Sequence, residues 1–208
     1  LALGRFGGGM LTHASDLDLI YLFTGDFTGM SDGRRPLEAT LYYNRLAQRV
    51  SAALSVATAA GPLYEVDTRL RPSGAQGLLA VSLDSFSQYE SEQAWTWEHM
   101  ALTRARPVFG SPAARAAAQA IVDETLARPR DPDVVDADAI RMRSDIAKHK
   151  PPFGPLDAKL VPGGLVDLEF CVHVAQLEHR IGFSPFLPDA IAGLVAAGYL
   201  DPGFGEAH

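Results

Sequence analysis

The sequence is poor in cysteine, in positive charge and in long apolar runs. Cys171 is the one cysteine among 208 residues. A single thiol excludes an internal disulfide framework and a zinc site built from several cysteines, and it suggests a reducing compartment. We therefore expect a cytoplasmic protein.

Positive charge is the second shortage. The 18 Lys and Arg residues are outnumbered by 25 Asp and Glu residues, which gives a formal net charge of −7. This balance argues against a surface that neutralises nucleic-acid phosphates or anionic lipid, although a small anionic ligand is compatible with it. We expect neither a nucleic acid nor a membrane among the partners.

Long apolar runs are missing as well. The longest stretch without a charged residue, 50–64, contains a Gly-Pro pair near its end and is shorter than the roughly 20 apolar residues that cross a bilayer. The chain also begins at Leu1, without an initiator Met or a basic signal region. We expect a segment of a longer protein.

Apolar periodicity, glycine and proline divide the chain into expected elements. Alternating or continuous apolar runs between turn residues predict strands, and apolar residues at helical spacing predict a helix. The expected strands lie at 16–23, 63–70 and 78–81, and the first helix at 36–60.

The second half of the chain has a different pattern. From residue 83 onward the apolar spacing is helical, and Pro, Arg and Asp crowd into a linker candidate at 129–133. We expect an α+β fold: a domain at 1–110 with a small mixed sheet and flanking helices, followed by an incomplete all-helical domain at 111–208.

Two carboxylates open the first expected strand. Side chains at i and i+2 of a strand point to the same face, so Asp16 and Asp18 project side by side, about 7 Å apart along the backbone. Such a pair repels itself unless a positive group lies between. Mg²⁺ suits it, because this ion takes one or two carboxylates plus substrate phosphates. Taken alone, Asp-x-Asp is more often an exposed strand edge or a turn cap.

A glycine-rich turn precedes these acids. Without side chains, Gly7 and Gly8 would let backbone N–H groups approach an anion closely, as phosphate-binding turns do. The turn lacks the Gly-Lys-Ser/Thr of a Walker loop and the spacing of a dinucleotide-binding GxGxxG. With the acidic pair it predicts a nucleoside triphosphate bound with a metal ion. An ordinary turn is the alternative for the glycines alone.

A third carboxylate lies on the second expected strand. Asp67 alternates in step with Arg69 and Arg71, so all three would project from one face, which Glu65 shares. Arginines suit phosphate oxygens, and three acids from two neighbouring strands can hold two metals for displacement at phosphorus. Alone, the arginines would be solvated or salt-bridged, one of them to Glu65. The combination is what a polymerase-beta-type nucleotidyltransferase requires.

Other polar residues fit structural roles. The six histidines include no pair at i, i+4, which argues against a zinc site. Asp167 and Glu169 fall in the first turn of an expected helix, where acids favour the helix dipole, and Cys171 on that helix is expected to be buried. Trp95 and Trp97 cannot share a helix face. At least one is expected in the core, with adenine stacking as the alternative.

Four longer stretches resemble successive motif blocks of the glutamine synthetase adenylyltransferase family, the bifunctional bacterial enzymes that add AMP to glutamine synthetase and remove it. The stretches are GRFGGGMLTHASDLDLIYLF, YEVDTRLRPSGAQGLLAVSLDSF, AWTWEHMALTRARPVFG and GGLVDLEF. Within them, EVDTRLRPSG and WTWEH are similar to the C-terminal, adenylylating half of that family.

The resemblance implies transfer of AMP. Asp16 and Asp18 would bind Mg²⁺, or Mn²⁺, with the triphosphate of ATP, while Asp67 would complete the metal site and help deprotonate the acceptor. Gly7 and Gly8 would line the phosphate turn. A tyrosine hydroxyl of glutamine synthetase would attack the α-phosphorus of ATP, and pyrophosphate would leave.

The resemblance also implies three partners: glutamine synthetase, the PII signal protein and the rest of a longer chain. One alternative is the AMP-removing phosphorylase half, with phosphate as attacker and ADP as product. A second is uridylyl transfer to PII by the related uridylyltransferase, which the EVDTRLRP and TWEHMAL wording disfavours. A third is a non-catalytic sensor of PII or glutamine, which the intact acidic triad disfavours.

Overall fold

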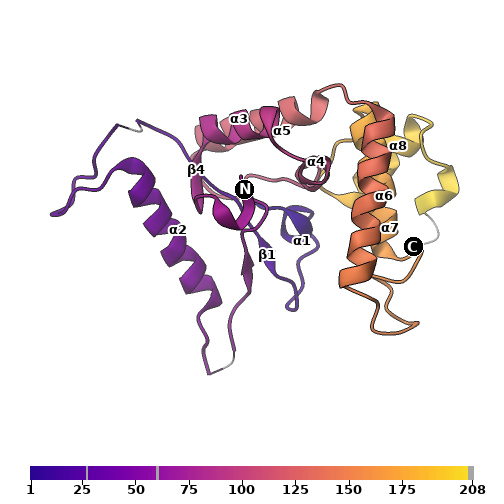
Figure 1. Ribbon diagram of the computed structural model, residues 1–208, viewed down its shortest axis with the longest axis horizontal. Helices are drawn as coiled ribbons and strands as arrows, with labels where there is room; N and C mark the ends of the chain where they lie inside the picture. The colour runs from indigo at the N-terminus through magenta and orange to yellow at the C-terminus, as the bar shows by residue number, and fades with distance from the viewer. Residues whose placement is uncertain (27, 60, 206–208) are drawn as a thin grey trace. The chain divides into compact units, whose positions relative to one another are not determined.

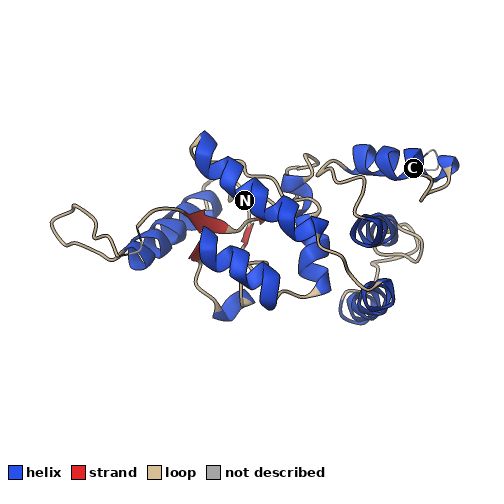
Figure 2. Ribbon diagram, turned by 90° about the horizontal axis from the view of Figure 1, so that it is seen from above, coloured by secondary structure: helices blue, strands red, loops and turns tan. Residues whose placement is uncertain are grey.

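The computed structural model describes residues 1–26, 28–59 and 61–205. Figure 1 shows the course of the chain, and Figure 2 shows that the strands are short and that most of the regular secondary structure is helical. The expected combination of helices with a small set of strands is therefore confirmed. Across these described segments, no helix combines the length and the apolar character needed to cross a bilayer.

The chain divides into two compact units. Unit 1 comprises Leu1–Ala94 and Arg104–Asp123, and unit 2 comprises Trp95–Thr103 and Glu124–His208. These bounds differ from the expected division at residue 110, because residues 95–103 before it belong to unit 2 and residues 111–123 after it belong to unit 1. The assignment of domains to 1–110 and 111–208 stays a prediction.

Unit 1 holds the strands. In chain order its elements are α1 (Gly4–Gly7), β1 (Leu17–Asp18), β2 (Tyr21–Phe23), α2 (Ala39–Ser55), β3 (Val66–Asp67), the 3-10 turn η1 (Gly74–Gln76), β4 (Ala80–Ser82) and α3 (Leu83–Glu92), and α5 (Pro112–Ala127) begins here. β1 pairs with β3 and β2 with β4, both in parallel. Ala2 adds antiparallel bridges to Leu19 and Arg106, so the strand pairing is mixed, as expected.

The expected strand at 16–23 is interrupted in its middle. The amide of Leu3 donates to Asp18 O at 3.0 Å, and the amide of Ile20 donates to Leu1 O at 2.9 Å. Residues at the start of the chain therefore form the hydrogen bonds of the backbone in the middle of residues 16–23. The residues before the break pair with β3 as β1, and those after it pair with β4 as β2.

The helix expected at 36–60 is shorter at both ends. Leu37 does not open it, because its carbonyl, which a helix would use four residues on, accepts from the Ser31 amide at 2.9 Å. The Leu37 amide donates to Ser31 Oγ at 3.0 Å. α2 begins two residues later. Near its other end, Leu54 O accepts from the amide of Tyr64 at 3.1 Å, and α2 stops at Ser55.

Asn44 fastens α2 to the sheet. Its Oδ1 accepts from the amides of Leu79 and Ala80 at 2.8 and 3.1 Å, and its Nδ2 donates to Ala80 O at 3.0 Å. The ring of Tyr43 stacks on Phe23 with centroids 4.5 Å apart. Polar and apolar contacts from successive residues of α2 thus hold β2 and β4.

Unit 2 is helical, as expected for the second half of the chain. Its elements are α4 (Thr96–Leu102), α6 (Pro132–His149), α7 (Leu165–His179), α8 (Leu187–Ala196) and the 3-10 turn η2 (Pro202–Gly205). α6 packs against α7 and α7 against α8, while α4 contacts both α6 and α7 (Figure 1). Leu168, Val172 and Leu194 lie in the core between α7 and α8.

Asp167 has the structural role that its place in a first helical turn predicts. Arg143 on α6 forms an ion pair with it through Nε, and Nη2 adds a hydrogen bond of 3.3 Å. The amide of Gly163 donates to Asp167 Oδ2 at 2.6 Å. These bonds join α6 to the start of α7. The expectation that Cys171 is buried is wrong, because this thiol is exposed on α7.

Candidate functional site

Asp18 and Asp67 occupy facing positions on two neighbouring strands. β1 and β3 run parallel, with Asp18 in register with Asp67. The amide of Leu17 donates to Glu65 O, and the amide of Leu19 donates to Asp67 O, both at 2.8 Å. Because paired strands lie about 4.8 Å apart, this register by itself brings the two carboxylates together.

Asp16 joins them from the turn that precedes β1. Ser15 closes this turn: its amide donates to Thr12 O at 3.0 Å, and its Oγ accepts from the Thr12 amide at 3.1 Å. Oxygen atoms of Asp16, Asp18 and Asp67 all lie within 4.8 Å of one another. The structure thus brings the three predicted acids together. Ser15 was not among the predicted residues, although a small hydroxyl residue directly before the acids was an available signal.

Gly4 lies against Asp18 and was also missed. Its φ of +52° is in the left-handed region. A Cβ atom at this position would lie 2.0 Å from Oδ2 of Asp18, so any side chain would displace the carboxylate. Glycine richness near the chain start was the available signal, but it directed attention to Gly7 and Gly8.

Gly7 ends α1 and Gly8 caps it. Their amides donate to Leu3 O at 2.7 Å and to Gly4 O at 3.0 Å. A Cβ atom on Gly7 would lie 2.0 Å from Arg104 O, so close backbone packing already requires glycine there. Contact of Gly7 and Gly8 with a phosphate stays a prediction.

Arg69 is the predicted arginine that reaches the acids. Its Nε donates to Oδ1 and Oδ2 of Asp67 at 3.0 and 2.8 Å, and its Nη2 also donates to Oδ2. The hydrogen bond to Asp67 raises the pKa of the guanidinium, and the charges of Asp67, Asp16 and Asp18 act in the same direction. The side chain is 74% exposed, which leaves it room to rotate toward a ligand.

Arg71 is used differently. It donates to Thr68 O at 2.8 Å, to Ala75 O at 3.2 Å and to Gly77 O at 3.3 Å. It thereby holds the loop that follows β3. The expectation of a strand over 63–70 with both arginines on one face is wrong, because β3 ends at Asp67.

The strand ends there for a local reason. The carboxylate of Asp67 accepts a hydrogen bond of 2.8 Å from the amide of Arg69, two residues on, which is the bonding of an Asx-turn. The Arg71 amide then donates to Thr68 O at 3.3 Å. The chain turns immediately after the acid, so β alternation no longer places its successors. Contact of Arg71 with a phosphate stays a prediction.

The cluster fits a hard divalent cation. Carboxylate oxygens suit Mg²⁺ and Mn²⁺. Two oxygens at 2.0–2.1 Å from one octahedral ion are about 3 Å apart in cis positions and about 4.2 Å apart in trans positions, and the atoms of the cluster lie within 4.8 Å of one another. Side-chain rotations that bring the oxygens closer would place all three on one ion, and a pair of ions about 3.5–4 Å apart would also be held.

Comparison with known proteins assigns the chain to a family. Residues 1–121, which contain every acid of the cluster, match the family described as glutamate-ammonia ligase adenylyltransferase. The chain belongs to this adenylyltransferase family. Glutamate-ammonia ligase is another name of glutamine synthetase, so the expected family is confirmed, and the matched range includes the first three of the four motif blocks.

Curated relatives of the adenylyltransferase family are similar over the whole chain. The bifunctional glutamine synthetase adenylyltransferase/adenylyl-removing enzyme of Brucella suis biovar 1 is 46% identical over 207 residues, 99% of this chain. The proteins of the same name from Mesorhizobium japonicum and Xanthobacter autotrophicus are 44% and 42% identical over 208 residues, 100% and 97% of this chain. The match covers 21% of each relative, so the chain spans about a fifth of their length.

Proposed function

We propose that this chain carries a polymerase-beta-type nucleotidyltransferase domain that transfers AMP from ATP to a tyrosine hydroxyl of glutamine synthetase. The convergence of Asp18 and Asp67 on two neighbouring parallel strands, with Asp16 from the turn before the first of them, carries this proposal. The relatives' names supply the transferred group and the acceptor protein.

In this proposal the three acids hold Mg²⁺ or Mn²⁺ beside the triphosphate. When bound, the metal supplies positive charge at the α-phosphate and at the departing oxygen. The tyrosine oxygen forms a bond to the α-phosphorus, and the bond from that phosphorus to the oxygen bridging to the β-phosphate breaks. Pyrophosphate leaves with the electron pair, and the phenolic proton passes to a base, for which Asp67 is the candidate.

Arg69 exchanges one anionic partner for another in this scheme. Its contact with Asp67 uses both carboxylate oxygens, which are the atoms that a metal ligand needs. A guanidinium can donate two parallel hydrogen bonds to a phosphate as it does to a carboxylate. Movement of Arg69 onto the triphosphate would therefore release Asp67 to the metal and to the acceptor proton.

Gly7, Gly8 and Arg71 complete the proposed nucleotide site. Their donor groups take part in bonds within unit 1, so their contribution would need those bonds to be shared or exchanged. The proposal includes two further partners, the PII signal protein and the rest of a longer chain. It also includes a cytoplasmic location for the protein.

The adenylyl-removing activity in the relatives' names supports a second candidate. The same acids would then position inorganic phosphate for attack on the phosphorus of the tyrosine-bound AMP. The bond from that phosphorus to the tyrosine oxygen would break, and ADP would leave. Both directions need the acid cluster, so the acids do not discriminate between them.

Two labelled substrates discriminate the directions. In the first arm, unmodified glutamine synthetase, Mg²⁺ and ATP labelled at the α-phosphate are mixed with the protein, and label on the synthetase is counted. In the second arm, the protein is mixed with phosphate and with synthetase that already carries labelled AMP, and labelled ADP is counted. We expect label transfer in the first arm, lost in Asp16→Asn and Asp67→Asn protein and retained in Asp32→Asn, whose carboxylate is exposed and outside the cluster.

Release of labelled ADP without transfer would overturn the adenylylating assignment in favour of the removing one. Transfer that persists in the Asp16→Asn and Asp67→Asn proteins would overturn the role of the acid cluster. If folded protein binds ATP but neither reaction occurs, the non-catalytic sensor replaces both candidates.

A further inference from the structure

Unit 2 contains a cavity that the proposed transferase chemistry does not use. Its volume is about 710 Å³, within the range of roughly 300–1,000 Å³ typical of small-molecule sites. It is lined by the start of α4, by one side of α6 and by residues at the start of α7 and just before it. Every lining residue belongs to unit 2.

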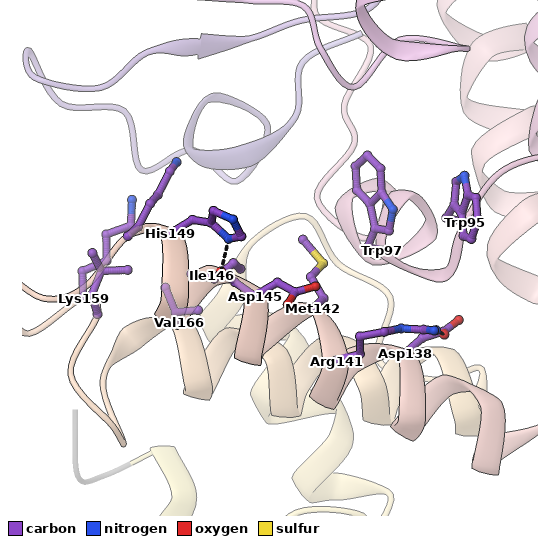
Figure 3. A pocket seen from close by; sticks show the side chains of 12 residues that line it. Trp95, Trp97, Asp138, Arg141, Met142, Asp145, Ile146, His149, Lys159 and Val166 are labelled. Atoms are coloured by element: carbon purple, nitrogen blue, oxygen red, sulfur yellow. Dashed lines mark hydrogen bonds and ion pairs between the residues drawn. The ribbon is translucent and has the colours of Figure 1, made fainter.

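The two ends of this cavity differ in chemistry. Figure 3 shows Trp95 and Trp97 at one end, and His149 and Lys159 at the other. Along α6 the lining residues run from Asp138 to His149, a distance of roughly 16 Å at 1.5 Å per residue. The cavity is therefore elongated, with an aromatic end and a basic end.

The aromatic end is held in place from two sides. Thr96, between the two tryptophans, donates from Oγ1 to Asp138 Oδ2 on α6 at 2.5 Å. The amide of Trp95 donates to Oε2 of the buried Glu98 at 2.8 Å, in a capping box at the start of α4. Trp95 nevertheless remains 62% exposed. A large indole that stays open to solvent on a fixed backbone is suited to stacking on a planar ring.

The acids of the lining are already paired. Asp138 forms an ion pair with Arg141 on the same helix, and Asp145 forms one with Lys148 at 3.3 Å. Lys148 itself is not among the lining residues. The negative charges near the cavity thus have cationic partners of their own.

The lysines of the basic end are not paired in this way. Within the described part of unit 2, neither Lys150 nor Lys159 forms an ion pair, although the charge of Asp157 acts on Lys159 from farther away. His149 donates from Nδ1 to Asp145 O at 2.8 Å, which fixes its ring at this end of the cavity (Figure 3). In a chain with a net charge of −7, two such lysines at the end of a cavity favour an anionic ligand group.

We infer that this cavity binds a nucleoside phosphate, with the base against the tryptophans and the phosphate at Lys150 and Lys159. A ring and an anion separated by a sugar match the aromatic end, the apolar middle at Met142 and Ile146, and the basic end. An entirely apolar ligand would form no ion pair with the lysines, and a bare anion would not stack on the indoles. The site is separate in its residues from the acid cluster of unit 1.

The tryptophans provide a direct readout, because the sequence contains two and both line the cavity. ADP, adenosine and inorganic pyrophosphate are titrated against tryptophan emission in EDTA, using Asp18→Asn/Asp67→Asn protein. The missing metal and altered acids remove the proposed transferase site from the measurement. We expect saturable quenching by ADP, with affinity at least ten-fold higher than that of adenosine or pyrophosphate.

Matched lysine variants locate the phosphate. Lys150→Ala/Lys159→Ala protein should bind ADP at least five-fold more weakly, while Lys148→Ala, a neighbouring lysine outside the lining, should change affinity less than two-fold. All three lysines are exposed, and circular dichroism checks that each variant is folded. Trp97→Phe should reduce both the signal and the affinity.

Three results would overturn the inference: no saturable quenching by ADP, equal affinity for ADP and adenosine, or equal effects of the Lys148 and Lys150/Lys159 changes. Quenching that needs Mg²⁺ and the intact acid cluster would place the nucleotide in unit 1 and overturn it as well. Because the assay excludes transferase chemistry, failure of the proposed AMP transfer leaves its expected result unchanged.

Discussion

Aspartate serves opposite purposes in the two units. In unit 1, Asp16, Asp18 and Asp67 are gathered so closely that their oxygens lie within 4.8 Å of one another. In unit 2, Asp167 is a single carboxylate matched by Arg143 and by a backbone amide. The first arrangement concentrates like charges and favours a bound cation, whereas the second completes the hydrogen bonding of one acid and joins two helices.

The arginines that pair with these acids also differ in how exposed they are. Arg69 beside the cluster has a side chain that is 74% exposed, while Arg143 is 19% exposed. Solvent screens the first pair and leaves its arginine able to change partner. The second pair is packed between α6 and α7. The proposed ligand-exchanging site and the ion pair that joins two helices are thus built from the same two residue types.

The largest expected effect is in unit 1. Asp18→Asn should lower the rate of AMP transfer by about 10²–10³-fold, since charge stabilisation at the reacting phosphate is lost. The free energy of unfolding should stay equal or rise, because one of three crowded charges is removed. Initial rates and thermal unfolding of the same samples check both statements, with Asp32→Asn as the control. A large loss of stability would show that the cluster is structural, as Asp167 is.

Gly4→Ala should have the next largest effect. The added Cβ meets Asp18 at 2.0 Å, and the positive φ costs about 1–2 kcal/mol for a non-glycine residue. We expect transfer to fall by about 10–100-fold, in line with the sensitivity of catalysis to small misplacements. Gly198→Ala is the matched control in unit 2, because Gly198 has a φ of +78° and nothing within 4 Å of an added Cβ. Equal loss of activity in both would refute the contact argument.

Asp167→Asn should act on stability alone. Loss of its charge-assisted bonds should cost about 1–2 kcal/mol of unfolding free energy, without changing the intrinsic rate of transfer. The Arg143 guanidinium lowers the pKa of Asp167 from its ordinary value of 3.8, and the Gly163 amide adds to this effect. The stability that the ionised Asp167 contributes is therefore complete above the pKa of this residue in the unfolded chain. It is lost as the pH falls from that value through the lower pKa of the folded protein. Denaturant unfolding from pH 6 to pH 3 should show the two proteins converging, and a constant difference would contradict the pairing.

The sequence was sufficient for the parts of the fold and site that depend on local pattern. Asp16 and Asp18 follow from Asp-x-Asp before an apolar run, Asp167 from its place in a first helical turn, and the helices of unit 2 from apolar spacing. The pairing of β1 with β3 was expected from chemistry, since three acids need two neighbouring strands. Register then brought Asp67 opposite Asp18.

The parts that sequence pattern missed depend on contacts between distant residues. Gly4 matters because the chain start lies against Asp18, which no local period reveals. Arg71 was misplaced because the carboxylate of Asp67 bonds to the chain two residues on and ends the strand. Leu37 stays outside α2 because its carbonyl accepts from the amide of Ser31, whose Oγ also accepts from the Leu37 amide. In each case a side chain or a long-range bond competes with the backbone pattern that the prediction used.

Arg69 and Arg143 provide the test with the smallest expected effects. The same substitution, arginine to alanine, should change the free energy of unfolding by different amounts in the two units. Arg69→Ala should change the free energy of unfolding by at most about 0.5 kcal/mol, as exposed ion pairs do, whereas Arg143→Ala should cost about 1–2 kcal/mol. Denaturant unfolding of both variants measures this difference.

The Arg69→Ala variant also tests the exchange of partners. Without Arg69 the oxygens of Asp67 are no longer shared, so Mn²⁺ should bind several-fold more tightly in the absence of nucleotide. The same variant should need more ATP for half-maximal transfer, since a phosphate partner is missing. Calorimetric titration with Mn²⁺ and rates across ATP concentrations measure the two shifts, which must have opposite signs if Arg69 exchanges Asp67 for phosphate.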